Sequence, residues 1–152
     1  MNVFYEFHKI IQCLQRDGIE YALVGGIALA FHTEPRFTKD IDILLRASDL
    51  DKMTAVLNEE GYFCSSAPWT FKNSGLTLHR FLKVQEGDEM MVDVLVSGDD
   101  PHDRIIRAAL EVESKGTGVV RVATRRDLIW LKEKRNSKQD QADIERLQNE
   151  KP

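Results

Sequence analysis

The chain has 152 residues, of which 42% are hydrophobic and 30% are charged, and its formal net charge at pH 7 is −4. This size and composition predict one globular domain with a sizeable core and exclude a largely disordered chain. The N-terminal segment mixes acidic and polar residues with apolar ones, so we expect neither a signal peptide nor a membrane span there. The two cysteines, Cys13 and Cys64, lack metal-ligand spacing, which favours reduced thiols and a cytoplasmic location.

Positive charge is concentrated at the C-terminal end. Residues 1–120 carry 12 Lys and Arg against 19 Asp and Glu, whereas residues 121–152 carry 9 against 6. An acidic body of this kind does not favour broad, charge-driven binding to nucleic acid. The basic end can present a local cationic patch to phosphates, or it can be the solvated face of a helix, and the charge pattern fits both.

Apolar spacing and turn residues predict helices and strands that alternate early in the chain. In order, these are a helix over 3–16, a strand over 21–25, a helix over 25–33, a strand over 40–46 and a helix over 49–61. Gly18 and Gly61 are expected to end the first and last of these helices, and Ser48 to cap the last.

From residue 62 the pattern changes to strands that pair locally, and helices return near the C-terminus. In order, we predict strands over 62–66, 76–84 and 90–97, a helix from 102 to about 113, a strand over 118–123 and a helical segment over about 124–149. Residues 67–75 are expected to form a flexible loop over the site. The mixture predicts an α/β (α+β) fold, in which helices pack on a sheet that is part parallel and part antiparallel.

Two aspartates one residue apart lie in the second predicted strand. Side chains alternate along a strand, so Asp40 and Asp42 point to the same face. The two carboxylates would repel each other and raise each other's pKa if they had no partner, and a divalent cation removes that conflict. Oxygen ligands of this kind suit Mg²⁺ or Mn²⁺. The alternative is that both acids sit at a solvated strand end, or that Asp40 caps a turn.

A third acid, Asp93, interrupts the apolar run "MMVDVLV". An unpaired charge in a buried strand is unfavourable, so Asp93 needs a partner. Asp42 and Asp93 have apolar neighbours on both sides in the sequence, and Lys39 is the basic residue beside Asp40. The apolar surroundings of the acids favour a shared cation. If the two strands are neighbours, Asp93 can be a third metal ligand or a general base for an attacking hydroxyl.

The glycine pair Gly25-Gly26 precedes a predicted helix. Without side chains, these residues allow backbone N–H groups to approach a phosphate at the start of the helix, whose dipole favours an anion. A glycine turn that binds no ligand has the same sequence, so this alternative stays open.

Together, "VGGIALAFHTEPRFTKDIDILL" and the later "VDVLV" resemble the nucleotidyltransferase superfamily that includes polymerase beta. Its signature is Gly-Gly or Gly-Ser opening a helix, then D-x-D on the next strand, then a third Asp or Glu on a later strand. The chain is most similar to small bacterial proteins related to the abortive-infection AbiEii toxins. The extended form of the motif is present through Ala28, Arg36 and Thr38, and the tail "DLIWLKEKRNSKQDQADIERL" is also similar. The resemblance spans roughly residues 20–147.

The resemblance implies a mixed-sheet nucleotidyltransferase fold in which Asp40, Asp42 and Asp93 hold two Mg²⁺ or Mn²⁺ ions. It implies transfer of a nucleoside monophosphate from a nucleoside triphosphate to a hydroxyl acceptor, with pyrophosphate leaving. Gly26 stands where many members carry Ser, so phosphate binding is left to backbone groups and cations.

Four further residues are candidates for nucleotide binding beside Gly25 and Gly26. Lys132 and Arg135 lie about one helical turn apart and can reach a triphosphate, or they can form an exposed helix face. Arg36 and Thr38 flank the D-x-D segment and can order its loop or bind substrate.

Two rival functions remain open on the sequence. A glycosyltransferase can use D-x-D to hold a nucleotide-sugar metal, but it requires neither the glycine-led helix nor Asp93. A non-catalytic nucleotide- or partner-binding module, half of a toxin-antitoxin pair with an antitoxin protein as partner, is the other. The acceptor is also open among RNA such as tRNA, a protein hydroxyl and a small molecule.

Overall fold

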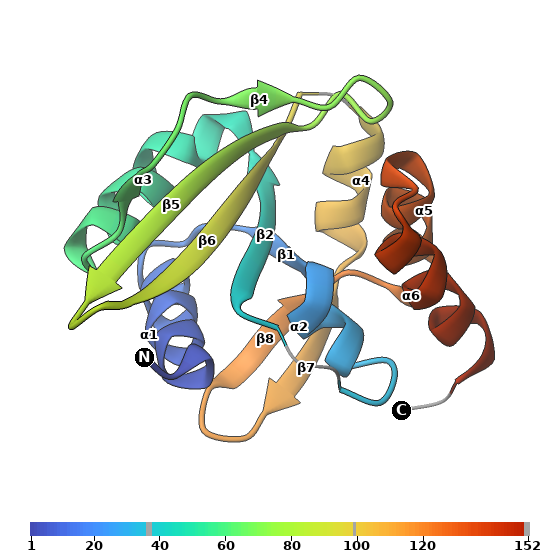
Figure 1. Cartoon of the computed structure of the whole chain (residues 1–152), viewed down its shortest axis with the longest axis horizontal. Helices are drawn as coiled ribbons and strands as arrows, with labels where there is room; N and C mark the ends of the chain where they lie inside the picture. The colour runs from blue at the N-terminus through green and yellow to red at the C-terminus, as the bar shows by residue number, and fades with distance from the viewer. Residues whose placement is uncertain (36–37, 99, 151–152) are drawn as a thin grey trace.

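The computed structural model describes residues 1–35, 38–98 and 100–150. Its helices and strands alternate early in the chain and end in a helix pair (Figure 1). The elements are α1 (Val3–Arg16), β1 (Tyr21–Val24), α2 (Gly25–Ala30), β2 (Asp40–Arg46), a 3₁₀ turn (Ala47–Asp49), α3 (Leu50–Glu59), β3 (Phe63–Cys64), β4 (Trp69–Thr70), β5 (Thr77–Gln85), β6 (Asp88–Ser97), α4 (Asp100–Ala108), β7 (Leu110–Ser114), β8 (Gly118–Val122), α5 (Arg125–Arg135) and α6 (Lys138–Asn149).

Within the described residues, eight strands form one mixed sheet. Its order is β3-β5-β6-β2-β1-β8-β7, with β4 paired to the N-terminal end of β5. The pairs β2–β6 and β1–β8 are parallel, and the remaining pairs are antiparallel. The predicted mixed sheet is therefore confirmed, and β2 and β6, the strands that carry the three aspartates, are neighbours at its centre.

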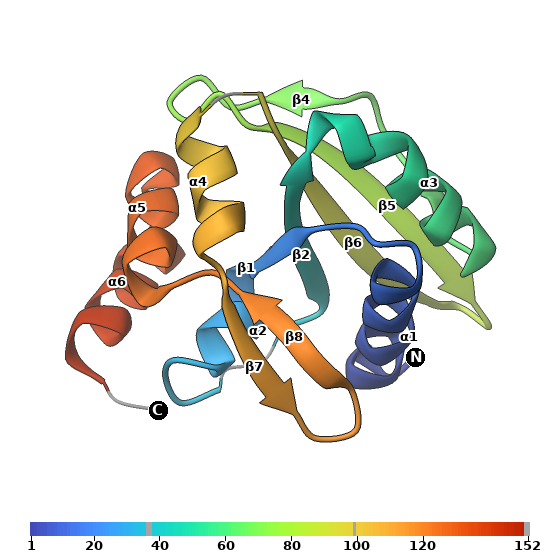
Figure 2. The same ribbon diagram turned by 180° about the vertical axis from the view of Figure 1, so that it is seen from behind.

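Helices lie on both sides of the sheet. Figure 2 shows α1, α3 and α4 on the side nearest the viewer, and α2 lies on the other side. Ile41 and Ile43 of β2 are fully buried, and they alternate with Asp40 and Asp42, which therefore point to the α2 side. The apolar face of the strand builds the core, and its acidic face is left for a site.

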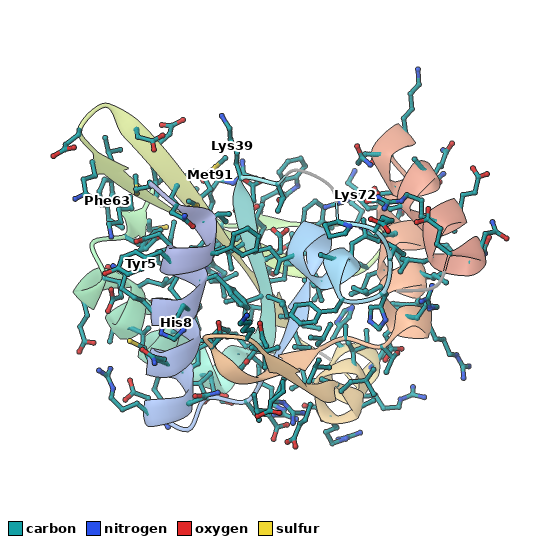
Figure 3. All side chains as sticks on the ribbon, turned by 90° about the horizontal axis from the view of Figure 1, so that it is seen from below. Tyr5, His8, Lys39, Phe63, Lys72 and Met91 are labelled. Atoms are coloured by element: carbon teal, nitrogen blue, oxygen red, sulfur yellow. The ribbon has the colours of Figure 1, made fainter. Side chains whose placement is uncertain are left out.

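The first helix forms where apolar residues recur at helical spacing. Asn2 caps it by accepting hydrogen bonds from the backbone N–H groups of Phe4 and Tyr5. Phe7, Ile10, Ile11 and Leu14 are buried against the sheet. Figure 3 shows Tyr5 and His8 on this helix, and Tyr5 is exposed.

Three details of the predicted elements are wrong. Ser48 does not cap α3: it lies within the 3₁₀ turn, and Asp49 precedes α3 without a side-chain cap. The helix predicted to reach about residue 113 ends at Ala108, because residues 110–114 form the edge strand β7, which pairs with β8. The segment 67–75 is not wholly a loop, since β4 pairs with β5.

The C-terminal helices are fixed by caps at both starts. The Thr124 side chain accepts from the backbone N–H of Asp127 at the start of α5. Ser137 and Asp140 form a reciprocal capping box at the start of α6, and Asn136 between the helices is left-handed with φ 54°. These signals make the sharp turn that folds α6 back onto α5. Among the described residues, no helix is long and apolar enough to cross a bilayer.

Candidate active site

The three predicted acids meet on adjacent strands. Asp42 of β2 is directly opposite Asp93 of β6 in the parallel ladder, and Asp40 lies opposite Met91. Asp40 and Asp42 are half-buried, whereas Asp93 is buried with 7% of its surface exposed. The long-range pairing of β2 with β6 therefore brings carboxylates 51 positions apart in sequence to the same rung of the sheet.

Gly25 leaves the space that Asp42 occupies. Its backbone is left-handed, with φ +72°, and a Cβ placed there would lie 2.0 Å from Oδ2 of Asp42. Val24, the residue before it, is opposite Asp42 in the antiparallel β1–β2 ladder. The first glycine is thus required both by its backbone conformation and by the aspartate beside it. Gly26 is buried within α2, a helix of only six residues.

Asp42 has a strongly raised pKa. Part of its surface is open to a cavity, but protein encloses it on the other sides, and this burial is the main reason that its pKa is raised, to about 7 in all. The neighbouring Asp93 and Asp40 raise the pKa further, while Arg135 and Lys132 lower it less strongly. Asp42 is therefore a carboxylate whose ionised form lacks sufficient positive charge around it.

Asp93 has a cationic partner that the sequence prediction did not include. Nε and Nη2 of Arg80 donate to Oδ1 and Oδ2 of Asp93 at 2.8 and 3.0 Å. Arg80 lies on β5, directly opposite Asp93 in the antiparallel β5–β6 ladder. Apolar residues flank Asp93 in the sequence, but in three dimensions strand pairing brings it a basic partner from 13 residues away.

A cavity of about 230 Å³ opens over Asp42 and Asp93, and Asp40 is not among the residues that line it. Asp42, Asp93, Arg80 and Gly25 contribute to its lining, together with Leu side chains of β5, β6 and α5. Residues 71–74 of the segment between β4 and β5 form one wall, and Nδ2 of Asn73 donates to the backbone carbonyl of Lys134 on α5 at 3.3 Å. The segment expected to lie over the site does so. Figure 3 shows Lys72 of this wall on the side of α2 and the C-terminal helices.

Lys132 and Arg135 of α5 line the same cavity, but acids of α6 already bind them. Nζ of Lys132 donates to Asp143 at 3.0 Å, and both side chains are buried. Arg135 donates from Nε and Nη2 to the two oxygens of Asp140 at 2.9 and 2.7 Å. Lys132 is not on an exposed face, so the solvated-face alternative is wrong for it. Whether either cation binds a nucleotide stays a prediction.

Asp140 has the opposite electrostatic environment to Asp42. Burial alone would raise its pKa, but hydrogen bonds from Arg135 and Ser137 outweigh burial and lower the pKa to about 2. This acid is fully compensated, and its role is to hold Arg135 in place.

Thr38 lies just before β2. The Thr38 hydroxyl donates to the backbone carbonyl of Asp40 and accepts from its N–H, both at 3.3 Å. Thr38 therefore orders the backbone at the first aspartate. Arg36 lies outside the described residues.

Sequence reasoning missed Arg80, Lys72 and Lys134, which also line the cavity. A signal for Arg80 exists, because an arginine in the apolar run "LHRFL" raises the same question as Asp93 in "MMVDVLV". No comparable signal marks Lys72 or Lys134, whose positions depend on how the loop and α5 fold over the sheet.

The carboxylate set fits a divalent cation in its donor chemistry. Asp42 and Asp93 on one rung, with Asp40 on the same strand face, offer the hard oxygen donors that Mg²⁺ and Mn²⁺ prefer. Burial and then the neighbouring carboxylates raise the pKa of Asp42, and a bound cation would favour its ionised form. In the arrangement of the described residues, where Arg80 holds Asp93, no group of three or more His, Cys, Asp or Glu side chains is positioned to enclose a metal ion.

Comparisons with known proteins agree with this architecture. The sequence profile of a family described as "uncharacterised nucleotidyltransferase" matches residues 1–150. No curated protein matches the chain at the sequence level.

Two solved structures share the fold at low identity. The lincosamide antibiotic adenylyltransferase LnuA, bound to lincomycin, is 16% identical, and the match covers 95% of this chain and 96% of that one with a TM-score of 0.67. ANT(2")-Ia, in complex with adenylyl-2"-tobramycin, is 14% identical, with 94% and 86% covered and a TM-score of 0.63. The comparisons support the superfamily resemblance, and the closer relation to the AbiEii toxins stays a prediction.

Proposed function

The chain belongs to the family of uncharacterised nucleotidyltransferases, and on that premise we propose that it transfers a nucleoside monophosphate from a nucleoside triphosphate to a hydroxyl acceptor with the help of Mg²⁺ or Mn²⁺. The observation that carries the proposal is the Asp42–Asp93 rung. Two carboxylates from separate strands face one cavity, where burial and, after it, the neighbouring negative charges raise the pKa of Asp42 to about 7.

The three aspartates have separate roles in the proposal. Asp40 and Asp42 would hold the divalent cation together with the triphosphate. Asp93 would be the third ligand, or the general base that accepts the proton of the attacking hydroxyl. When bound, the cation would stabilise charge on the phosphates and on the attacking oxygen.

The reaction follows from these roles. The acceptor oxygen forms a bond to the α-phosphorus, and the bond from that phosphorus to the β-phosphate oxygen breaks. Pyrophosphate leaves with the bonding electrons, and the proton of the hydroxyl passes to Asp93 or to water. Residues 71–74, on the cavity wall, would limit the access of water to the reacting phosphorus.

Phosphate binding would use cations and backbone at the cavity wall. Lys132 and Arg135 project from α5 into the lining, held by Asp143 and Asp140. Preformed ion pairs of this kind lower the entropy that is lost when a long side chain binds an anion. Gly25, Gly26 and Thr38, at the starts of α2 and β2, belong to the proposed set. Arg36 is included on the sequence motif alone.

The acceptor is the least constrained part of the proposal. LnuA and ANT(2")-Ia act on antibiotics, so lincomycin and tobramycin are direct candidates to test. RNA and protein hydroxyls use the same chemistry and are tested in the same way. An antitoxin protein is expected as partner only if the protein acts as a toxin.

The test is a transfer assay with each α-³²P-labelled nucleoside triphosphate, Mg²⁺ or Mn²⁺, and separate acceptor pools of aminoglycosides, lincosamides, RNA and protein. We expect label in one pool with the parent protein and none with Asp42→Asn. Glu89→Gln, an exposed acid on β6, is the matched control and should retain transfer. If no pool is labelled while triphosphate still binds, the protein is a nucleotide-binding module instead.

A further inference from the structure

Arg80 occupies an unusual position among the cations of the cavity. Its guanidinium binds both carboxylate oxygens of Asp93, and it also lies within electrostatic range of Asp40 and Asp42. The Asp93 side chain is 9% exposed, whereas that of Arg80 is 41% exposed. The acid is thus fixed in the sheet, and the cation that covers it is open to the cavity.

The ion pairs of Lys132 and Arg135 differ from the Arg80–Asp93 pair in the acids that they involve. Those two cations bind acids of α6 that lie outside the sheet site, so a ligand of the three sheet aspartates would leave both pairs intact. The partner of Arg80 is itself one of the three sheet aspartates. Any group that binds Asp93 must therefore share it with Arg80 or displace Arg80.

We infer that Arg80 is a phosphate-binding residue that a divalent cation releases from Asp93. This inference rests on the proposed function, since it requires the metal and the triphosphate to bind in the cavity. With no metal, Arg80 neutralises Asp93. With metal on Asp93, the guanidinium loses its partner and binds a phosphate oxygen of the triphosphate.

The exchange follows from the hydrogen-bond geometry and from charge. Both oxygens of Asp93 already accept from Arg80, and a cation on the same oxygens would place two positive groups side by side. Repulsion between the cation and the guanidinium favours the release of Arg80, whose side chain is long and open to the cavity. A guanidinium that leaves a carboxylate is well suited to a phosphate, because the same pair of N–H groups binds either anion.

The first measurement is the affinity for Mn²⁺ alone, by isothermal titration calorimetry, in the parent and in Arg80→Gln. Loss of the competing guanidinium should tighten Mn²⁺ binding about tenfold, the scale of a charge-assisted hydrogen-bond pair. Lys72→Gln is the matched control, because Lys72 lines the same cavity but does not bind Asp93. It should change Mn²⁺ affinity less than threefold.

The second measurement is the affinity for the non-hydrolysable α,β-methylene analogues of ATP, CTP, GTP and UTP, each titrated with saturating Mn²⁺. Arg80→Gln should bind the preferred analogue about tenfold or more weakly, because the released cation is missing. Arg80→Lys, which keeps the charge, should lie between Gln and the parent in both measurements. Tighter Mn²⁺ binding together with weaker analogue binding in Arg80→Gln separates this role from structural damage, because damage would weaken both affinities.

Several outcomes overturn the inference. Equal Mn²⁺ affinities for the parent and Arg80→Gln would exclude competition, and so would an equal gain in Lys72→Gln, which would indicate a general charge effect. Unchanged analogue affinity in Arg80→Gln would exclude phosphate binding. Each of these leaves the proposed function intact. If the parent binds neither Mn²⁺ nor any analogue, the proposed function and the inference both fail.

Discussion

Two groups of acids near one cavity have opposite electrostatic environments. The sheet carboxylates, Asp40, Asp42 and Asp93, include one whose pKa is raised to about 7, whereas the helix carboxylates, Asp140 and Asp143, include one whose pKa is lowered to about 2. Each helix carboxylate has its own cation on α5. Among the sheet carboxylates, the ion pair described is that of Asp93 with Arg80, and Asp42 keeps excess negative charge.

The difference separates structural acids from acids that are suited to a ligand. A carboxylate with a complete set of donors stabilises the fold and has little to gain from a further cation. A carboxylate with too few donors lowers stability in the ligand-free protein and gains when a cation arrives. Substitutions in the two groups should therefore change stability in opposite directions.

The largest effect is expected for Asp143→Ala. It removes the partner of Lys132, leaving a buried ammonium group without its carboxylate. The free energy of unfolding should fall by about 3–5 kcal/mol, measured by urea denaturation followed by circular dichroism. Glu145→Ala, an exposed acid on the same helix, is the control and should stay within about 0.5 kcal/mol of the parent. Equal losses in the two variants would contradict the structural role of the pair.

Asp42→Asn should instead increase the free energy of unfolding in metal-free buffer. Because the folded-state pKa of Asp42 is about 7 against an ordinary 3.8, the folded protein holds a proton that the unfolded chain has released between these values. Stability therefore falls as pH rises through this window, and the full penalty is present above pH 7. At pH 8 the variant should be more stable than the parent by about 2–4 kcal/mol. The gain should vanish at pH 4, and a gain that persists there would disprove this cause.

Asp93→Asn sharpens the comparison within the sheet carboxylates. Transfer should fall by about 100-fold or more, the scale of a lost general base. Affinity for a triphosphate analogue should change much less, because Asp40 and Asp42 remain. Initial rates and calorimetry on the same samples separate the two quantities. Equal transfer by the parent and the variant would remove Asp93 from the chemistry, and a parallel loss of affinity would make it a binding residue instead.

The smallest effect is expected for Asp140→Asn, whose loss of stability should depend on pH in the acid range. The folded-state pKa of Asp140 is about 2, below the ordinary 3.8, so its contribution to stability is present above pH 4 and is lost as pH falls towards 2. The difference in unfolding free energy between the parent and Asp140→Asn should be about 1–2 kcal/mol at pH 5, since the solvent-open Arg135 is partly screened. At pH 2 the difference should shrink towards zero. A difference independent of pH would assign the effect to the capping geometry instead.

The sequence singles out the three sheet carboxylates because their signal is local. Asp40 and Asp42 alternate with apolar residues, and Asp93 interrupts an apolar strand, so each stands out from its neighbours. The pairing of Asp93 with Arg80 is not local: it depends on the register of β5 against β6. A one-residue shift of that register would move Arg80 to the other face of the sheet.

The helix carboxylates were missed for a related reason. Lys132 and Arg135 look like a cationic face when α5 is considered alone, and their partners become visible only when α6 folds back at Asn136. The sequence predicts a helical extension in place of β7 because Leu110 lies four residues after Ile106, and Val112 seven after Ile105, which is helical spacing. Its strand character comes from pairing with β8.

Position 25 has a consequence for how this sequence can change over generations. Every amino acid that could replace glycine adds a side chain, and even a methyl group at Gly25 would overlap the carboxylate of Asp42. The backbone there is also left-handed, which L-amino acids other than glycine rarely adopt. No single-step neutral substitution exists at this position while Asp42 is kept. A side chain at position 25 therefore becomes possible only after a smaller residue has replaced Asp42.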